Sequence, residues 1–527
     1  MAVQPPLLQP LVEAELLEVG GGRIGVCRPV LCPAMELVIG SVFDNAATAV
    51  PSRPAAVLGG QAISYGELSR RATQMGHVLA GIGVSRGDRV VTWSDNNLES
   101  VALFVALARM GAVFAPANAR LSSDEAAEMV GLARPKLLVA GPGHAEAGQG
   151  VADAVGVPLV RLGGKGPGLD LAAEAQSASP AALPPSGVGE DDPHVVFFTS
   201  GSTGKSKGVV LSHRCNWLRT RTPALLEPRG ATVCMYPMFH MGAWTIALQA
   251  WQARGQVVFT DRAEADVLID AVQAQQAAYM NCIPAVWRRV LEANRHQDMA
   301  SLRFATSGTS ATPPELLADL KAAFPNAHRR VFYGSTEAGS VTMLDDADME
   351  YRPGSCGQAH TGAEVRLDRG ELQTRSPFMF DGYFDNPEAT AEAFTDDGWF
   401  RTGDLAEVDG DGFYSITGRV KDVIRTGGET VSPAEVESHL ADIAGAAEVA
   451  VVGIPDDRWG EVVCAVFVLA PGAALPTPDE VQAHLSNRLA RYKHPRRTEA
   501  MPAIPRTPAT LQVRRRDLVA AILATGS

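Results

Sequence analysis

Apolar residues along this chain recur with helical spacing in some segments and form short unbroken runs in others. Residues 66–83 and 100–111 show the helical spacing, and residues 89–93, 112–116 and 195–198 form short runs. The spaced segments predict helices, and the short runs predict buried strands. Because helices and strands alternate, we expect a parallel β-sheet with helices on its faces.

Two later segments depart from this alternation. Residues 177–193 are rich in Ser, Ala, Pro and Gly and end in acidic residues, which predicts a surface linker between two lobes. After Asp404, the tetrapeptide Asp409-Gly-Asp-Gly separates two short strand-like runs and predicts a hairpin. These aspartates do not fit an EF-hand loop, because Val420 would occupy its twelfth position.

The last part of the chain predicts a small α+β unit. Residues 435–440 have the pattern of a helix, and residues 448–452 have that of a strand. We place a domain boundary near residues 418–421. The chain is thus expected to consist of an N-terminal extension whose Pro, Gly and Leu follow no sustained period, a large domain and a small C-terminal domain, at residues 1–36, 37–418 and 419–527.

The composition limits the classes of function. The chain has 527 residues, of which 46% are hydrophobic, and a formal net charge of −13. Nucleic acid and anionic membranes both require a basic face, so neither is an expected partner. The seven cysteines are scattered without a C-x-x-C pair, and the N-terminus has no clean apolar signal region, so we expect a cytoplasmic location. The most apolar stretch, residues 101–117, contains Arg109 and Gly111 and predicts a buried helix rather than a membrane span.

A run rich in glycine and hydroxyl groups follows the strand-like residues 195–198. It reads Thr199-Ser-Gly-Ser-Thr-Gly-Lys-Ser-Lys-Gly208. Its glycines permit backbone amides to converge, and its hydroxyl and ammonium groups are further donors for phosphate oxygens. It is not a Walker A loop, because Thr199 stands where that motif requires glycine. The alternative is a solvated Ser/Gly turn. The residues expected to bind phosphate are Thr199, Ser200, Gly201, Ser202, Thr203, Gly204 and Lys205.

This run is similar to the phosphate loop of the adenylate-forming (ANL) superfamily, which includes acyl-CoA synthetases, adenylation domains of peptide synthetases and luciferases. Similar motifs continue in the same order over residues 37–518. The resemblance implies an α/β plus α+β fold. Its parts would be a large N-terminal domain of helix-covered β-sheets with a small β-barrel-like subdomain, and a small mobile C-terminal α+β domain. The implied activity is that of an acid-thiol ligase acting on CoA.

The resemblance also assigns roles in a nucleotide site. In Tyr333-Gly-Ser-Thr-Glu-Ala-Gly339, Tyr333 would stack on adenine, Thr336 would contact the α-phosphate and Glu337 would hold Mg²⁺. In Arg401-Thr-Gly-Asp404, Asp404 would accept from both ribose hydroxyls. Taken singly, Glu337 is equally explained as an acid in the first turn of a helix and Asp404 as a turn residue. The nucleotide-binding residues implied outside the phosphate loop are Gly308, Thr309, Ser310, Tyr333, Gly334, Ser335, Thr336, Asp404 and Arg419.

The acyl site is assigned to Pro237-Met-Phe-His-Met-Gly242, which resembles the family's acyl-pocket segment. His240 is expected to face the substrate and to be catalytic, although a histidine packed between Met and Phe is the alternative. The pocket would be mostly apolar and would suit a bulky or aryl carboxylate better than acetate. Its expected lining is His240, Met241, Gly242, Trp244, Cys282 and Ser335.

In this family the small domain rotates after adenylation, and Lys421 aligns with the hinge. Thr426-Gly-Gly-Glu-Thr430 resembles the loop that then enters beside the adenylate. Gly427 and Gly428 would leave room for the pantetheine arm of CoA, since any side chain there would narrow the tunnel. Gly428 and Glu429 are therefore expected among the catalytic residues.

One position breaks the family pattern. The adenylation lysine of the family ends a run resembling Pro-Arg-Thr-Pro-Ser-Gly-Lys, whereas here Pro505-Arg-Thr-Pro-Ala-Thr is followed by Leu511, and no lysine follows Lys493. The missing ammonium would bridge the carboxylate and the α-phosphate as pyrophosphate leaves. Such an electrostatic contact contributes about 3–4 kcal/mol, or about 10²–10³ in rate. A cation from Arg514 or Arg515 would be a poor substitute, because a planar guanidinium does not replace a point charge.

We therefore expect a ligase that takes a preformed acyl-adenylate and CoA, releases AMP, and depends on a separate adenylating enzyme. ATP and Mg²⁺ would be needed in addition only if adenylation is retained. Such a variant is similar to the non-adenylating acyl-CoA ligases of bacterial diterpenoid antibiotic pathways of the platensimycin and platencin type. Three alternatives stay open. They are a complete ATP-dependent acyl-CoA synthetase, natural or with an engineered lysine replacement, acyl loading of a carrier protein, and a non-catalytic adenylate-binding pseudoenzyme.

Overall fold

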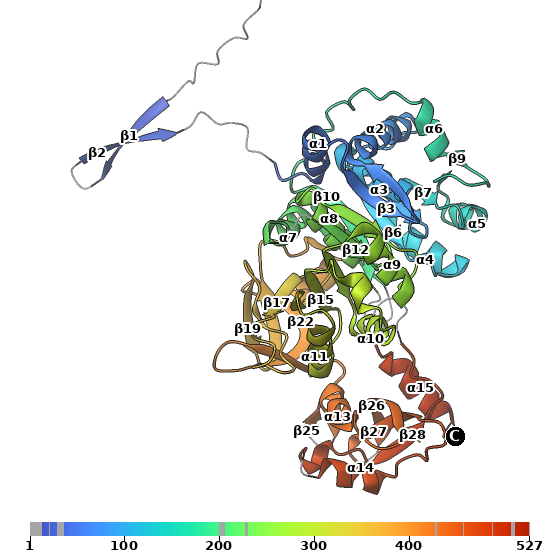
Figure 1. Cartoon of the computed structure of the whole chain (residues 1–527), viewed down its shortest axis with the longest axis vertical. Helices are drawn as coiled ribbons and strands as arrows, with labels where there is room; N and C mark the ends of the chain where they lie inside the picture. The colour runs from blue at the N-terminus through green and yellow to red at the C-terminus, as the bar shows by residue number, and fades with distance from the viewer. Residues whose placement is uncertain are drawn as a thin grey trace, which may run out of the picture.

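The computed structural model describes the backbone of residues 13–19 and 22–28 and, more fully, the ranges 36–199, 206–226, 230–426, 429–456, 458–486, 488–506 and 512–525. Strands β1 (Glu13–Val19) and β2 (Gly22–Arg28) pair antiparallel with each other and with no other described strand. They stand apart from the rest of the chain in Figure 1. The predicted N-terminal extension therefore contains a hairpin that the apolar pattern did not indicate.

The first large sheet has eight strands in the order β21-β11-β10-β6-β5-β7-β8-β9. The pairs from β10 to β9 are parallel, and β10–β11 and β11–β21 are antiparallel. The predicted parallel, helix-covered sheet is thus confirmed, with an antiparallel edge. Its strands are β5 (Arg89–Trp93), β6 (Val113–Ala117), β7 (Leu137–Ala140), β8 (Leu159–Arg161), β9 (Leu169–Asp170), β10 (Pro193–Thr199), β11 (Lys207–Ser212) and β21 (Gly382–Tyr383).

The second large sheet has nine strands in the order β18-β17-β16-β15-β14-β12-β13-β3-β4. Its middle strands, from β16 to β3, run parallel, and antiparallel pairs close both edges. The strands are β3 (Pro54–Leu58), β4 (Gln61–Ser64), β12 (Ala231–Cys234), β13 (Gln256–Phe259), β14 (Tyr279–Cys282), β15 (Phe304–Gly308), β16 (His328–Ser335), β17 (Gly339–Asp345) and β18 (Gln358–Ala359).

Helices connect these strands and cover the two sheets (Figure 1). They are α1 (Ile39–Ala49), α2 (Tyr65–Gly81), α3 (Leu98–Met110), α4 (Ser123–Ala133), α5 (Ala145–Val155), α6 (Leu171–Ser177), α7 (His213–Leu226), α8 (Met241–Gln252), α9 (Ala265–Gln275), α10 (Pro284–Glu292), the short 3₁₀ helix η1 (His296–Met299), α11 (Pro314–Ala323) and α12 (Pro387–Ala393).

The apolar stretch 101–117 is not one buried helix but consists of α3 followed by β6, as predicted from the narrower segments 100–111 and 112–116. The Asn97 side chain caps α3 by accepting from the Ser100 amide at 2.7 Å. Gly111, with φ 68°, ends the helix in the left-handed conformation that glycine adopts readily. Among the described helices, none is long and apolar enough to cross a membrane.

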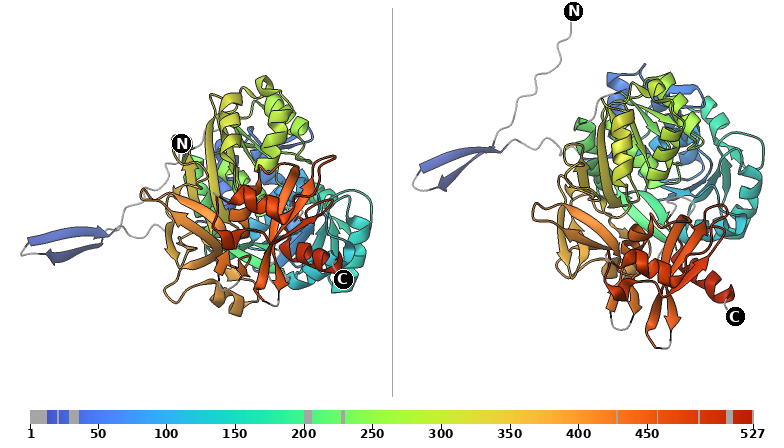
Figure 2. Two further views of the ribbon diagram at one scale, coloured as in Figure 1. Left: turned by 90° about the horizontal axis from the view of Figure 1, so that it is seen from below. Right: turned by 60° about the horizontal axis from the view of Figure 1, so that its bottom comes forward.

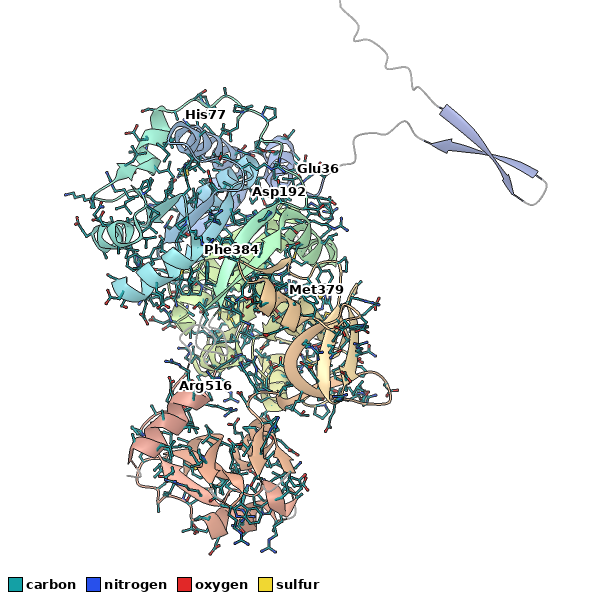
Figure 3. All side chains as sticks on the ribbon, turned by 180° about the vertical axis from the view of Figure 1, so that it is seen from behind. Glu36, His77, Asp192, Met379, Phe384 and Arg516 are labelled. Atoms are coloured by element: carbon teal, nitrogen blue, oxygen red, sulfur yellow. The ribbon has the colours of Figure 1, made fainter. Side chains whose placement is uncertain are left out.

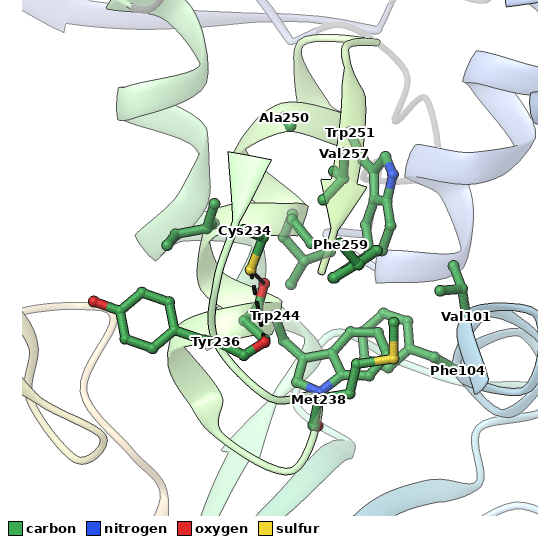
Figure 4. Packing of buried hydrophobic residues seen from close by; sticks show 14 of the residues in the cluster. Val101, Phe104, Cys234, Tyr236, Met238, Trp244, Ala250, Trp251, Val257 and Phe259 are labelled. Carbon is green, nitrogen blue, oxygen red and sulfur yellow. Dashed lines mark hydrogen bonds between the residues drawn. The ribbon is translucent and has the colours of Figure 1, made fainter. Parts of the chain in front are cut away.

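The main core combines residues of both large sheets with helices α3 and α8. The Phe104 ring of α3 stacks on the Trp244 indole of α8, with ring centroids 4.1 Å apart and planes at 16° (Figure 4). Two buried indoles of this core also have hydrogen-bond acceptors, because Trp244 Nε1 donates to the Met238 carbonyl at 2.6 Å and Trp251 Nε1 to the Ala55 carbonyl at 2.9 Å. These two indole N–H groups are thus satisfied without breaking the aromatic packing.

The expected β-barrel-like subdomain is a four-stranded antiparallel sheet in the order β19-β20-β22-β23. Its outer strands are linked by the Tyr414 hydroxyl, which donates to the Val365 carbonyl at 3.2 Å. The predicted Asp409 turn lies between β22 and β23, as expected for a hairpin. The strands are β19 (Glu364–Asp368), β20 (Glu371–Arg375), β22 (Phe400–Val408) and β23 (Tyr414–Arg419).

The chain after β23 forms a separate five-stranded sheet with helices, drawn in orange to red at one end of the molecule in Figures 1 and 2. Apolar clusters cover both faces of this sheet, which agrees with the predicted α+β unit. Its elements are β24 (Ile424–Thr426), β25 (Glu429–Val431), α13 (Pro433–Leu440), β26 (Ala446–Asp456), β27 (Gly460–Leu469), α14 (Pro478–Leu485), η2 (Arg491–Lys493), β28 (Arg497–Ala500) and α15 (Arg515–Thr525).

The segment 177–193 has a different role from the predicted one. Residues 178–192 form no helix or strand and none of them is buried, so the surface position is confirmed. The segment begins after β9 and α6 and ends at β10, however, and β10 belongs to the same eight-stranded sheet as β9. The segment therefore returns across one sheet and does not connect two lobes.

Two buried histidines predict sensitivity to acid. His213 accepts from the Ile39 amide at 3.2 Å, and its ring lies 4.5 Å from that of His194. Burial lowers the pKa of His213 to about 4. Between pH 6.5 and 4 the unfolded chain therefore binds a proton that the folded chain does not, and the free energy of unfolding should fall by about 1 kcal/mol per pH unit as the pH is lowered. His213→Gln should flatten this slope in urea unfolding at pH 4.5–7.5, whereas His77→Gln, at a partly exposed position, should not.

Candidate active site

The predicted phosphate loop connects β10 to β11. Thr199 pairs with Lys207, and Phe198 pairs with Gly208, so both ends of the run belong to strands. Gly208 is therefore a packing residue, because an added Cβ would lie 2.9 Å from Val196 Cγ1. This corrects its assignment to the converging amides of the loop. The predicted binding residues Ser200, Gly201, Ser202, Thr203, Gly204 and Lys205 lie outside the described residues.

Residues 307–310 include the last two residues of β15 and the two residues that follow it. Gly308 pairs with Phe332 of β16, and an added Cβ would lie 2.9 Å from the Phe332 carbonyl oxygen. Thr309 has φ 72°, which is uncommon for a β-branched residue and stores strain next to a candidate site. The side chains of Thr309 and Ser310 are exposed. The structure therefore places these predicted adenine-flanking residues beside Tyr333 on the neighbouring strand.

Tyr333-Gly-Ser-Thr-Glu-Ala-Gly339 forms a tight return from β16 to β17. Gly334 is required at the bulge, since an added Cβ would lie only 2.0 Å from the Gly339 carbonyl oxygen. The Ser335 hydroxyl accepts from the Ala338 amide at 3.1 Å and holds the turn. Thr336 and Glu337 are thus presented at the tip of a two-stranded turn, and Glu337 does not begin a helix.

Tyr333 and Asp404 come together although 71 residues separate them. The Tyr333 hydroxyl donates to Asp404 Oδ2 at 2.6 Å, and Arg419 Nε lies 2.9 Å from Asp404 Oδ1. The register of the hairpin explains the second contact, because Asp404 and Arg419 are direct partners in β22 and β23. Burial, together with the Asp404 carboxylate, raises the pKa of Tyr333 well above its usual value, so the phenol stays protonated. An ionised carboxylate has about four acceptor sites, which leaves acceptor capacity on Asp404 for ribose hydroxyls.

Glu337 has a partner that the sequence did not reveal. Tyr383 of β21 donates its hydroxyl to Glu337 Oε1 at 3.1 Å. The Lys207 ammonium lies 4.7 Å from the centroid of the Tyr383 ring, a cation–π contact at the base of the phosphate loop. Lys207, Tyr383 and Glu337 therefore connect the phosphate loop to the predicted metal ligand. Tyr383 lies 46 residues from Glu337, so no local pattern indicated it.

Arg219 of α7 is a second residue that sequence reasoning missed. Its side chain is buried, and its guanidinium donates to the Thr336 carbonyl at 3.1 Å and to the Phe378 carbonyl at 2.7 Å. The Phe380 amide donates to the Glu337 carbonyl at 2.8 Å. These bonds fix the backbone of Thr336 and Glu337. The buried Arg219 guanidinium also places a positive charge next to Thr336, the residue that is expected to contact the α-phosphate.

His240 precedes α8 and caps it. The Gly242 amide donates to His240 Nδ1 at 3.1 Å, so in the neutral imidazole the proton is on Nε2. Burial lowers the pKa of His240 to about 4, which keeps the ring neutral at pH 7. Its plane lies at 18° to the ring of Tyr236, with centroids 5.8 Å apart. His240 thus offers one neutral donor, Nε2–H.

Three residues expected in the acyl pocket belong to the core instead. Trp244 is 1% exposed and stacks on Phe104, and Cys282 has no exposed surface. His240 is the N-cap residue with an extended backbone (φ −108°, ψ 135°), so its side chain does not follow the helix face that carries Trp244. Met241 is also buried, whereas Ser335 is exposed on the turn after β16.

The predicted hinge lies in the turn between β23 and β24. The Lys421 side chain is exposed, and desolvation together with Arg419 lowers its pKa. Glu429 is exposed on β25 of the small domain. Among the described residues, no hydrogen bond or ion pair joins Glu429 to Tyr333 or Asp404. Gly428 and Leu511 lie outside the described residues.

Comparison with known proteins identifies relatives along most of the chain. The model of the AMP-binding enzyme family matches residues 43–384, and that of the AMP-binding enzyme C-terminal domain matches residues 435–510. A feruloyl-CoA synthase of Amycolatopsis sp is 34% identical over 472 residues, which cover 85% of this chain and 92% of that protein. The long-chain-fatty-acid–CoA ligase FadD13 of Mycobacterium tuberculosis is 31% identical over 468 residues, covering 85% of this chain and 90% of FadD13.

The fold agrees with these relatives. The crystal structure of ATP-bound MatB from Rhodopseudomonas palustris superposes with a TM-score of 0.83 at 29% identity, and the match covers 94% of this chain and 100% of MatB. AMP-binding acyl-CoA ligases use ATP, CoA and Mg²⁺. The chain therefore belongs to the AMP-binding enzymes, as an acyl-CoA ligase of the adenylate-forming superfamily.

Proposed function

We propose that this enzyme transfers the acyl group of a preformed acyl-adenylate to CoA, while its own ATP-dependent adenylation is weak or lost. In the proposed reaction the CoA sulfur forms a bond to the acyl carbon and the bond from that carbon to the phosphate oxygen breaks. AMP leaves, and the thiol proton passes to solvent. The observation that carries the proposal is Leu511 at the lysine position of a chain that otherwise carries the adenylate motifs of the family in order.

The ion pairs of three cations of the small domain support this proposal. The Lys493 ammonium pairs with Glu435, and the Arg515 guanidinium pairs with Glu437. The Arg514 guanidinium lies 2.9 Å from the Asp517 carboxylate in the next turn of α15. The two arginines weighed as substitutes for the lysine are therefore occupied within the small domain. A paired guanidinium would have to leave its carboxylate before it met a phosphate.

The contacts of Asp404 support an adenylate site. Asp404 is held by Tyr333 and Arg419, and its remaining acceptor sites suit the two ribose hydroxyls. These contacts would bind AMP or an acyl-adenylate regardless of which enzyme made the anhydride. Free CoA is the proposed acceptor, although a carrier protein presents the same pantetheine thiol.

Glu337 is suited to bind Mg²⁺. Its carboxylate accepts one hydrogen bond from Tyr383 and forms no ion pair with a described cation. Among the described residues, no group of three or more His, Cys, Asp or Glu side chains gathers to hold a metal. Mg²⁺ commonly binds through one or two carboxylates together with substrate phosphates and water. The ion would neutralise phosphate charge in the adenylation step, which is the step proposed to be weak.

The proposed acyl group is a bulky or aryl one. The position where His240 and Tyr236 stack offers two flat rings and one neutral donor, which suits a planar apolar acyl group better than acetate. The similarity to a feruloyl-CoA synthase supports an aryl acid as the first probe.

A complete ATP-dependent ligase is the second candidate, and Arg516 favours it. Arg516 is exposed at the start of α15, between the small and large domains in Figure 3, and has no hydrogen-bonded or ion-paired partner among the described residues. It is the remaining cation of the triplet 514–516 that is free to approach a phosphate. Arg516→Ala should abolish residual ATP-dependent activity if this arginine supplies the missing charge.

The two candidates predict different relative rates of thioester formation from two reaction mixtures. We expect feruloyl-CoA to form from synthetic feruloyl-AMP and CoA at least about 10²-fold faster than from ferulate, ATP, Mg²⁺ and CoA, because the lost ammonium is worth about 3–4 kcal/mol in the first step alone. Thioester formation would be followed by its absorbance, and adenylation by pyrophosphate release. Comparable rates from both mixtures would contradict the proposal, and no thioester from any of a panel of aryl and alkyl adenylates would favour a pseudoenzyme.

A further inference from the structure

Four buried polar side chains form one hydrogen-bonded chain across the second large sheet. The Tyr236 hydroxyl donates to Asn281 Oδ1 at 2.7 Å, and Asn281 Nδ2 donates to the Thr306 hydroxyl at 2.7 Å. The Thr306 hydroxyl donates in turn to the Tyr279 hydroxyl at 3.0 Å. All four side chains are buried. Parallel strands covered on both faces normally carry apolar residues, so this chain of hydrogen bonds requires an explanation.

The first member of the chain contacts the candidate acyl site. Tyr236 follows β12, and its ring points away from the aromatic cluster of Trp244 and Phe104 (Figure 4). On that side it stacks on His240, with planes at 18°. The Gly242 amide holds His240 Nδ1, and an added Cβ at Gly242 would lie 3.1 Å from that nitrogen. The imidazole is therefore confined by a backbone donor at one atom and by the Tyr236 ring on one face.

The hydroxyl of Tyr236 decides where its ring lies. Asn281 has a defined orientation, because its amide oxygen meets Tyr236 and its amide nitrogen meets Thr306. The Trp287 indole donates to the Thr306 carbonyl at 2.8 Å, which anchors the middle of the chain to α10. An apolar set of equal size would avoid desolvating these groups, so a fully satisfied polar chain is expected where it fixes one arrangement.

We propose that Tyr236 and Asn281 are positioning residues that fix the plane of His240, so that Nε2–H, which the Gly242 amide defines as the protonated nitrogen, is the donor offered to the bound acyl-adenylate. The inference rests on the proposed transfer of an acyl group from an adenylate. Tyr236 and Asn281 touch no reacting atom in this scheme. They act through His240, which distinguishes them from residues that only stabilise the fold.

A double-mutant cycle tests whether Tyr236 acts through His240. Tyr236→Phe keeps the ring and removes only the hydroxyl. We expect it to lower kcat for feruloyl-AMP and CoA about tenfold with little change in KM. In the His240→Ala background the same substitution should have no further effect, because residues in one network are not additive. Additive losses, or an unchanged kcat in Tyr236→Phe, would overturn the proposal.

Tyr65 provides a matched control. It is as deeply buried as Tyr236, and its hydroxyl donates to the Gly255 carbonyl at 2.6 Å, away from His240. Tyr65→Phe should lower Tm and leave kcat unchanged. The double variant Tyr236→Phe/Asn281→Leu lacks both polar partners. It should therefore regain much of the stability that Tyr236→Phe loses, while kcat stays low. Recovery of the rate in this double variant, or an equal loss of kcat in Tyr65→Phe, would assign the network to folding alone.

A measurement without substrate separates this inference from the proposed function. In protein labelled with ¹⁵N-histidine, the His240 signals should show one Nε2-protonated form, because the Gly242 amide donates to Nδ1. Tyr236→Phe should shift and broaden these signals as the imidazole loses its fixed plane, without changing which nitrogen is protonated. His240→Gln identifies the signals. Unchanged His240 signals in Tyr236→Phe would overturn the positioning role. If the wild type converts no adenylate, the proposed function fails, and a shift of the His240 signals would still support the positioning by Tyr236.

Discussion

Leu511→Lys is expected to raise the rate of ATP-dependent adenylation by about 10²–10³, because it restores an ammonium worth about 3–4 kcal/mol at the α-phosphate. The side chains of leucine and lysine share their first two carbons, and the change adds reach and one charge. Adenylation would be measured as pyrophosphate released from ferulate, ATP and Mg²⁺. Thioester formation from feruloyl-AMP should stay within about twofold of the wild type, because the family mechanism removes this position from the site in that step.

Two variants control for this gain. Leu511→Met lengthens the side chain without adding charge and should leave adenylation slow. Gln512→Lys places the ammonium one residue later, on an exposed position beside the Arg506–Val513 bridge. A gain in Gln512→Lys alone would assign the lysine position to residue 512 and keep the rest of the proposal. No gain in either lysine variant would show that the loss of this charge does not limit adenylation.

Asp404→Ala is expected to weaken AMP binding about 10²-fold. The substitution removes a carboxylate that is expected to accept from both ribose hydroxyls, and each hydrogen bond to a charged group contributes about 1.5 kcal/mol or more. It also leaves the Tyr333 hydroxyl without its acceptor and Arg419 without its carboxylate. Titration calorimetry with AMP would measure the change in Kd, and urea unfolding would measure the accompanying loss of stability.

Two further variants test the role of the Asp404 charge and control for the loss of a carboxylate elsewhere. Asp404→Asn keeps an acceptor for Tyr333 but loses the ion pair with Arg419, so its effect on Kd should be smaller than that of Asp404→Ala. Asp409→Asn changes an exposed carboxylate that accepts from the Asp411 and Phe413 amides in the turn after β22. It should leave the Kd for AMP unchanged. Wild-type affinity for AMP in Asp404→Ala would exclude this carboxylate from the nucleotide site.

Local pattern was sufficient for much of the fold. The strand predicted at residues 89–93 has those bounds in β5, and the helices predicted at 66–83 and 100–111 lie within two residues of α2 and α3 at each end. These elements depend on the spacing of apolar residues and on caps such as Asn97 and Gly111, which lie within the segment itself. The apolar stretch 101–117 was more difficult, because a buried helix and a buried strand are both apolar throughout and only Gly111 separates them.

The candidate site was predicted only in part. Motif order indicated Tyr333, Glu337 and Asp404 but not that Tyr333 donates to Asp404 or that Tyr383 donates to Glu337. Arg219 and Asn281 carry no motif, because what makes them relevant is the carbonyl or hydroxyl that each meets on a segment far away in the chain. Trp244 was placed in the acyl pocket by its nearness to His240 in sequence, whereas its indole stacks on Phe104 in the core.

The sequence by itself determined the alternation of strands and helices, the order of the adenylate motifs and the absence of a lysine after Lys493. These features follow from residue type and from periods of a few residues. Only the tertiary structure decided which side chains meet, such as Tyr333 with Asp404 and Tyr236 with His240. Such contacts depend on strand register and on the packing of helices between two sheets, and both are set by interactions among residues far apart in the chain.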